Sequence, residues 1–102
     1  MAYIIKRTDL ANEDLLAAIN YIADDSSITA ALKYLDILEQ SINKLADFPE
    51  MGVKPRYKSL RLQGFRVLIV ESHLVFYKVF NEAREIIIYR IFHGKQEYKN
   101  LI

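Results

Sequence analysis

The chain has 102 residues, 52% of them hydrophobic and 26% charged, which is typical of one ordinary globular domain. It contains no cysteine, which excludes disulfides and thiolate chemistry and makes a reducing cytoplasm the expected location. The N-terminal apolar stretch around Tyr3–Ile5 is far too short for a signal peptide or a membrane span. We therefore expect a single cytoplasmic domain over residues 1–102 with no membrane partner.

The net charge of +1 conceals a strong asymmetry between the two halves. Residues 1–50 carry four basic and nine acidic side chains, whereas residues 51–102 carry ten basic and four acidic ones. Residues 51–70 hold five bases and no acid. This split suggests an anionic partner for the second half, and a solvated basic edge that protects a sheet from aggregation is the alternative.

The first half predicts one short strand and two amphipathic helices. Tyr3–Lys6 is typical of a strand, and Thr8 or Asp9 can cap the helix that follows. A polar break at Asp24–Ser27 separates it from a longer helix over about Thr29–Asp47. In both helices apolar residues recur every three or four positions, so each has one face that needs a partner surface. These positions are Leu15, Ile19 and Ile22, followed by Ala31, Leu35, Leu38, Ile42 and Leu45.

The basic middle of the chain is expected to form a hairpin. Because proline cannot continue a helix and glycine permits a turn, Pro49 and Gly52 end the second helix. Strands are then expected at Ser59–Leu62 and Phe65–Val70. Gln63–Gly64 between them is expected to form a tight turn.

The apolar stretch Leu74–His93 is the segment against which the rest should pack. Its two runs are rich in Val, Ile, Phe and Tyr and are joined by Asn81–Arg84, a length that suits a hairpin link. Neither run alternates cleanly, so we expect both faces of these strands to be covered. The predicted order is β-α-α-β-β-β-β, an α+β fold with two N-terminal helices packed on a mainly antiparallel sheet.

Motifs for metal, nucleotide or hydrolytic chemistry are missing from the sequence. Its two histidines, His73 and His93, have no second ligand at metal-binding spacing. The three glycines form no phosphate-binding loop, and no G-x-S-x-G nucleophile motif occurs. We therefore expect neither a metal nor a cofactor, and His73, expected in a turn, receives no role.

Basic residues nevertheless suggest a site for an anion. In the expected hairpin Arg61 lies opposite Arg66, which is unfavourable unless an anion or a partner's carboxylate sits between them; solvated edge charges are the alternative. His93 precedes Gly94 at the end of the last strand, where it can shuttle a proton beside a phosphate; a structural histidine is the alternative. Further candidates for contact with nucleic acid or a protein target are Lys54, Arg56, Tyr57, Lys58, Arg90 and Tyr98.

Four segments follow one another along nearly the whole chain: Leu45–Gly52, Gly64–Arg66, Leu74–Val79 and Ile88–Gly94. In this order they resemble the toxin subunits of bacterial type II toxin–antitoxin modules, the RelE/ParE superfamily. The resemblance implies the same fold of two N-terminal helices on an antiparallel sheet. It also implies a cognate antitoxin that neutralises the protein in a hetero-oligomer.

The resemblance leaves two activities open. ParE-like members inhibit DNA gyrase with no known catalytic residues, whereas RelE-like members cut mRNA on the ribosome without a metal. Arg66 and His93 match functional positions of the ribonuclease branch, and Tyr98 matches its tail tyrosine only loosely. The segment Leu45–Gly52, the closing His93–Gly94 and the modest net charge favour the ParE-like activity, because a protein that docks on ribosomal RNA should be strongly basic. The expected function is therefore gyrase inhibition, with ribosome-dependent mRNA cleavage as the alternative and a degenerate member that only binds its antitoxin as a third option.

Overall fold

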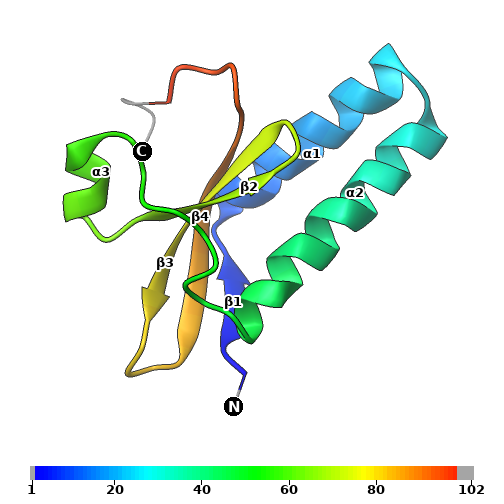
Figure 1. Cartoon of the computed structure of the whole chain (residues 1–102). Helices are drawn as coiled ribbons and strands as arrows, with labels where there is room; N and C mark the ends of the chain where they lie inside the picture. The colour runs from blue at the N-terminus through cyan, green and yellow to red at the C-terminus, as the bar shows by residue number, and fades with distance from the viewer. Residues whose placement is uncertain (1, 99–102) are drawn as a thin grey trace.

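A computed structural model describes residues 2–98, which form one four-stranded sheet with helices against it (Figure 1). In chain order the elements are β1 (Ile4–Arg7), α1 (Asp9–Asp25), α2 (Ile28–Asn43), the 3-10 turn η1 (Lys44–Ala46), α3 (Lys58–Leu62), β2 (Arg66–Val70), β3 (His73–Phe80) and β4 (Glu85–His93). The spatial order is β1-β4-β3-β2, with β1 parallel to β4 and the other neighbours antiparallel. The predicted α+β class, with two N-terminal helices on a mainly antiparallel sheet, is confirmed.

Side-chain caps begin the two long helices. The Oγ1 of Thr8 accepts a hydrogen bond from the Ala11 amide at 3.1 Å, and the Oγ of Ser27 accepts one from the Ala30 amide at 3.0 Å. The Thr8 hydroxyl also donates to the Tyr89 carbonyl at 2.8 Å, which ties the start of α1 to the sheet. No helix within residues 2–98 is long and apolar enough to cross a membrane.

The main core lies between the helices and one face of the sheet, here called the helix face. Both helices contribute residues from the apolar positions that the sequence periodicity predicts, and the sheet supplies alternate residues of three strands. The fully buried members include Ala11, Leu38, Ile42, Leu45, Val75, Tyr77, Ile86 and Ile88.

A second, smaller core covers the opposite face of the sheet, here called the outer face. It consists of Leu60, Phe65, Val67, Phe76 and Phe92, all less than 9% exposed. Helix α3 and the tail after β4 supply the cover, with Tyr57 and Tyr98 packed against the cluster. The prediction that both faces of the central strands are covered is therefore confirmed.

The strand predicted at Ser59–Leu62 is wrong, because that segment lies in α3. Gly64, at φ +89°, ends this helix and does not join two strands. The Gly64 amide donates to the Arg61 carbonyl at 3.0 Å, and the Phe65 amide donates to the Leu60 carbonyl at 3.2 Å. This pair of bonds is the Schellman motif, which uses a left-handed glycine just as a hairpin turn does.

Candidate functional site

Arg66 begins β2 and is bonded to the loop that follows η1. Its guanidinium donates to the carbonyl of Glu50 at 2.9 Å and to that of Gly52 at 2.7 Å. Its strand partner is Tyr77, and Arg61 does not face it. The expected pair of opposed arginines is therefore wrong, since the hairpin that would have created it is absent.

Tyr77, on β3, binds the backbone of the same loop through its hydroxyl. Its hydroxyl donates to the Pro49 carbonyl at 2.8 Å and accepts from the Gly52 amide at 2.9 Å. A Cβ at Gly52 would lie 2.6 Å from this hydroxyl oxygen, so the loop approaches the sheet too closely for a side chain there. Burial raises the pKa of Tyr77, while its hydrogen bonds to Gly52 and Arg66 oppose that rise.

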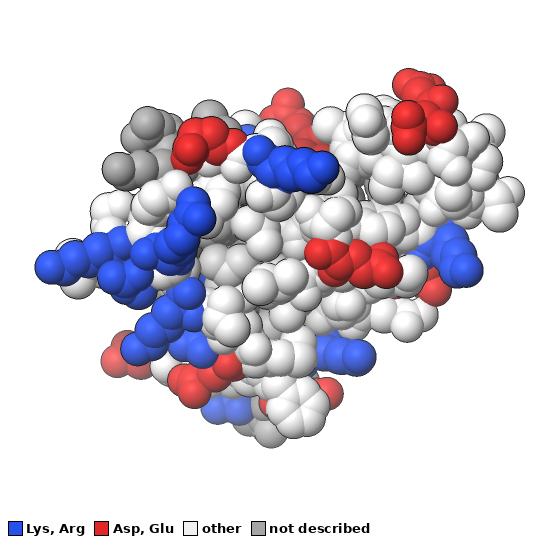
Figure 2. Space-filling view, turned by 45° about the horizontal axis from the view of Figure 1, so that its top comes forward, with Lys and Arg blue, Asp and Glu red and all other residues white. Residues whose placement is uncertain are grey.

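Arg61 also binds the backbone. Its Nη1 donates to the carbonyls of Pro55 at 3.0 Å and Arg56 at 2.6 Å. These bonds fold the segment before α3 back onto the helix. They leave a basic surface consisting of the exposed Lys54, Arg56, Lys58 and Arg61. Figure 2 shows Lys and Arg side chains gathered on the side of the molecule where α3 lies.

Tyr57 and Tyr98, two expected contact residues, pack against each other with ring centroids 5.4 Å apart. Tyr98 also lies 4.9 Å from the Phe76 ring and stacks at 6.1 Å on Phe92. The Arg56 guanidinium lies 4.9 Å from the Tyr57 ring and donates to its hydroxyl at 2.8 Å, and this bond raises the pKa of Arg56. Both tyrosines are therefore half-buried parts of the outer face.

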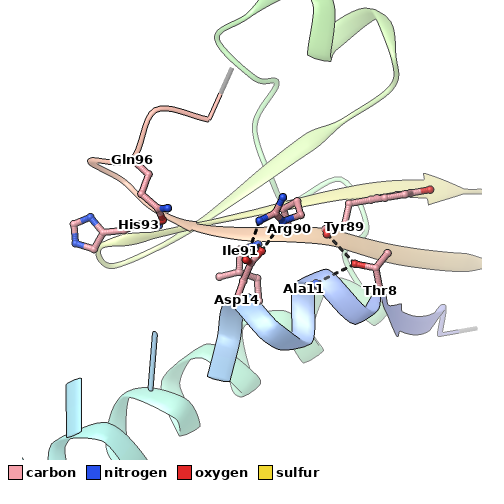
Figure 3. A network of polar contacts seen from close by, with 8 residues as sticks. All are labelled: Thr8, Ala11, Asp14, Tyr89, Arg90, Ile91, His93 and Gln96. Atoms are coloured by element: carbon pink, nitrogen blue, oxygen red, sulfur yellow. Dashed lines mark hydrogen bonds and ion pairs between the residues drawn. The ribbon is translucent and has the colours of Figure 1, made fainter. Parts of the chain in front are cut away.

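Arg90 joins the sheet to α1 (Figure 3). Its Nε and Nη2 donate to the two carboxylate oxygens of Asp14 at 2.7 and 3.0 Å, and the Ile91 amide donates to the same carboxylate at 3.0 Å. The hydrogen bond to Asp14 raises the pKa of Arg90. This bidentate ion pair occupies the Arg90 guanidinium, which was expected to contact a target.

His93 stands at the end of β4 and points away from the pair formed by Arg90 and Asp14 (Figure 3). Its Nδ1 accepts a hydrogen bond from the Lys95 amide at 3.1 Å, and its own amide donates to the Gln96 side chain at 2.7 Å. The ring is half-buried and lines a pocket of about 450 Å³. The pocket wall opposite His93 comes from α1, so His93 faces the helix side of the sheet.

The surroundings of His73 differ from the turn that the sequence pattern predicts. This histidine is the first residue of β3 and is buried, with its Nδ1 2.6 Å from the Tyr34 hydroxyl of α2. Its ring centroid lies 5.3 Å from that of His93, its strand partner. Burial, and to a lesser extent the nearby His93, lower the pKa of His73. The available signal was its place directly before the apolar run that starts at Leu74.

The structure does not bring Arg66 and His93 together. Arg66 pairs with Tyr77 and His93 pairs with His73, and these two partners lie four positions apart on β3. That separation is about 13 Å along a strand. Arg66 also extends toward the loop at Glu50, so the two side chains do not converge on one phosphate. Within residues 2–98 no group of three His, Cys, Asp or Glu side chains is placed to hold a metal.

A family model supplies the comparison that decides the classification: the ParE toxin of the type II toxin–antitoxin system parDE matches residues 5–98. The chain belongs to this family. The predicted membership of the RelE/ParE superfamily is thereby confirmed. No curated protein matches the sequence.

Solved structures agree with the ParE-family assignment at the level of the fold. The chromosomal ParDE system from P. aeruginosa has a TM-score of 0.76 at 22% identity, over 92% of this chain and 98% of that one. The RelBE2 toxin–antitoxin complex from Mycobacterium tuberculosis has a TM-score of 0.61 at 19% identity, over 91% and 99%. At such identities the likeness establishes the fold alone.

Proposed function

We propose that this ParE-family chain is a toxin that inhibits DNA gyrase by binding it and is neutralised by a cognate antitoxin. Membership of the family supports the role of toxin. The observation that favours binding over mRNA cleavage is the separation of Arg66 from His93, with the Arg66 guanidinium already bonded to two carbonyls. Metal-independent cleavage needs a proton-transfer group and a positioned cation at the same phosphate.

Two assays separate the activities. Purified toxin is expected to block supercoiling by gyrase in a reaction that contains no ribosomes. On programmed ribosomes it is expected to leave mRNA intact. Ribosome-dependent cleavage without an effect on gyrase would replace the proposed function with the RelE-like alternative.

The variant His93→Gln tests the catalytic alternative in the same assays. Glutamine keeps a polar side chain but cannot cycle a proton near neutral pH. A ribonuclease that uses His93 would lose about 10²–10⁴-fold in cleavage rate, the usual contribution of general acid–base catalysis. For a gyrase inhibitor we expect His93→Gln to retain full inhibition.

The antitoxin is proposed to cover the outward side of the helix pair. Leu10 and Leu16 on α1, with Ile28 and Leu32 on α2, are between 52% and 71% exposed, so these apolar side chains are available to a partner. An amphipathic partner segment would bury these side chains. Hydrogen exchange of the complex should show slower exchange in α1 and α2 than in the free toxin. Protection confined to β1 would contradict this arrangement.

A further inference from the structure

Within residues 2–98, none of Lys54, Arg56, Lys58 and Arg61, the residues of the basic surface, takes part in a salt bridge. The salt bridges within residues 2–98 join Lys6 to Glu85, Arg7 to Glu39 and Arg90 to Asp14. Glu97 accepts a hydrogen bond from the Tyr57 hydroxyl at 3.4 Å, and its charge contributes to the raised pKa of Arg56.

These cations are held in place by the fold. Leu60, in the middle of α3, and Phe65, just after the turn that ends the helix, are both buried in the outer core. Arg61 binds the backbone of the segment that carries Lys54 and Arg56. The charges therefore project from a rigid unit, and ordering them on a ligand costs less conformational entropy than it would on a flexible tail.

The aromatic side chains beside the basic surface indicate which anionic polymer suits it. Proteins that hold unpaired bases present free aromatic faces for stacking. Here Tyr57 packs on Tyr98, and Tyr98 packs on Phe76 and Phe92. Because these rings pack on one another, their faces are not free to stack on bases. A ligand of this surface would therefore be bound mainly by its cations. That chemistry suits the regular phosphates of a duplex, whose bases stay paired.

We propose that the basic surface contacts the phosphate backbone of double-stranded DNA held by gyrase. The inference rests on the proposed function, since gyrase supplies the DNA and the toxin then binds the complex through protein and DNA together. The contact is independent of base sequence, because phosphate contacts carry no sequence information. The outer face thus carries the DNA contact, while the helix pair on the opposite face stays free for the antitoxin.

The test measures binding of the purified, full-length toxin to a fluorescent DNA duplex at several salt concentrations. Each phosphate neutralised contributes about −0.9 to the slope of log affinity against log salt. Lys58→Glu should flatten the slope by about one and weaken binding roughly five- to tenfold at 0.1 M salt. Lys58 is exposed at the start of α3, where an acidic residue is tolerated, so the fold is preserved.

Lys33→Glu is the matched control, since Lys33 is also exposed on a helix but lies on α2, across the sheet from α3. It changes the net charge equally and should leave the slope unchanged. Equal losses in both variants, or an affinity that ignores salt, would overturn the proposal. Displacement of the labelled duplex by polyglutamate at a lower concentration of negative charge than unlabelled duplex requires would also overturn it and assign the surface to an acidic protein.

Gyrase assays keep this proposal separate from the proposed function. If Lys58→Glu weakens inhibition of gyrase on DNA but still binds gyrase alone, the DNA contact is supported. If it inhibits gyrase as well as the unsubstituted toxin, the DNA contact fails while gyrase inhibition stands. A toxin that binds duplex DNA through Lys58 and has no effect on gyrase would overturn the proposed function and, with it, the gyrase-held DNA as partner.

Discussion

The two faces of the sheet are covered by different means. On the helix face, α1 and α2, with 17 and 16 residues, bury a continuous apolar stripe. On the outer face, five-residue α3 relies on one buried leucine, a glycine-ended turn and an arginine bonded to backbone. The helix face therefore draws its stability from buried area. The outer face buries less apolar area under its helix but holds charged side chains on a rigid surface. That arrangement suits it to recognition.

Truncation of a core leucine on each face should give the largest effects. Replacing Leu38, a fully buried residue of α2, by alanine is expected to cost about 2–5 kcal/mol of unfolding free energy. Leu60→Ala on α3 should cost less, because once this leucine is removed the short helix can undock while the rest stays folded. Urea denaturation gives both values, and hydrogen exchange should show faster exchange confined to α3 in Leu60→Ala.

Leu62→Ala is the control for that pair, since Leu62 lies on α3 but is 76% exposed. It should change the unfolding free energy by no more than about 0.5 kcal/mol. Loss of protection in α1 and α2 as well as α3 in Leu60→Ala would show that the two faces unfold as one unit.

Arg66 is expected to have an intermediate effect, at the junction of the sheet and the Pro49–Gly52 loop. Hydrogen bonds to a charged donor contribute about 1.5–3 kcal/mol, so Arg66→Ala should destabilise the protein by roughly that amount. Arg66→Lys should restore only part of it, because an ammonium lacks the planar fork that reaches both carbonyls. Denaturation and growth inhibition should be measured on the same variants. Toxicity that disappears at full stability would place Arg66 in the functional site.

The unfolding free energy should depend on pH through His73, which lies where α2 meets the sheet. The folded state lowers the pKa of His73, whose surroundings are the Tyr34 hydroxyl, Ser72 and His93. As pH falls below the ordinary histidine pKa of about 6.5, the unfolded chain therefore takes up more protons than the folded protein. The unfolding free energy should stay constant above that pH and fall below it, by at most about 1.4 kcal/mol per pH unit.

Denaturation between pH 7.5 and 5.5 measures this effect before the carboxylates titrate. His73→Gln should flatten the dependence in that window, whereas His93→Gln should retain most of it. A profile that is unchanged by His73→Gln would place the sensitive group elsewhere.

Local patterns in the sequence were enough to predict the two long helices and the central hairpin. The three- to four-residue periodicity of α1 and α2 and the apolar runs of β3 and β4 each record which side of an element is buried. The lack of alternation in the hairpin correctly required cover on both faces. Such features depend on neighbours within one element, so a single stretch contains them.

Only the tertiary structure decided what happens between elements. Gln63–Gly64 suits a hairpin or a helix end equally, because both need a left-handed glycine, and the burial of Leu60 selected the helix. Arg66 binds loop carbonyls 14 and 16 positions away in the sequence. Arg90 binds Asp14, which lies 76 positions away. The same holds for His73 and Tyr34, 39 positions apart. A polar side chain takes its partner from whatever the packed fold brings within hydrogen-bond distance, and that proximity is written in no local pattern.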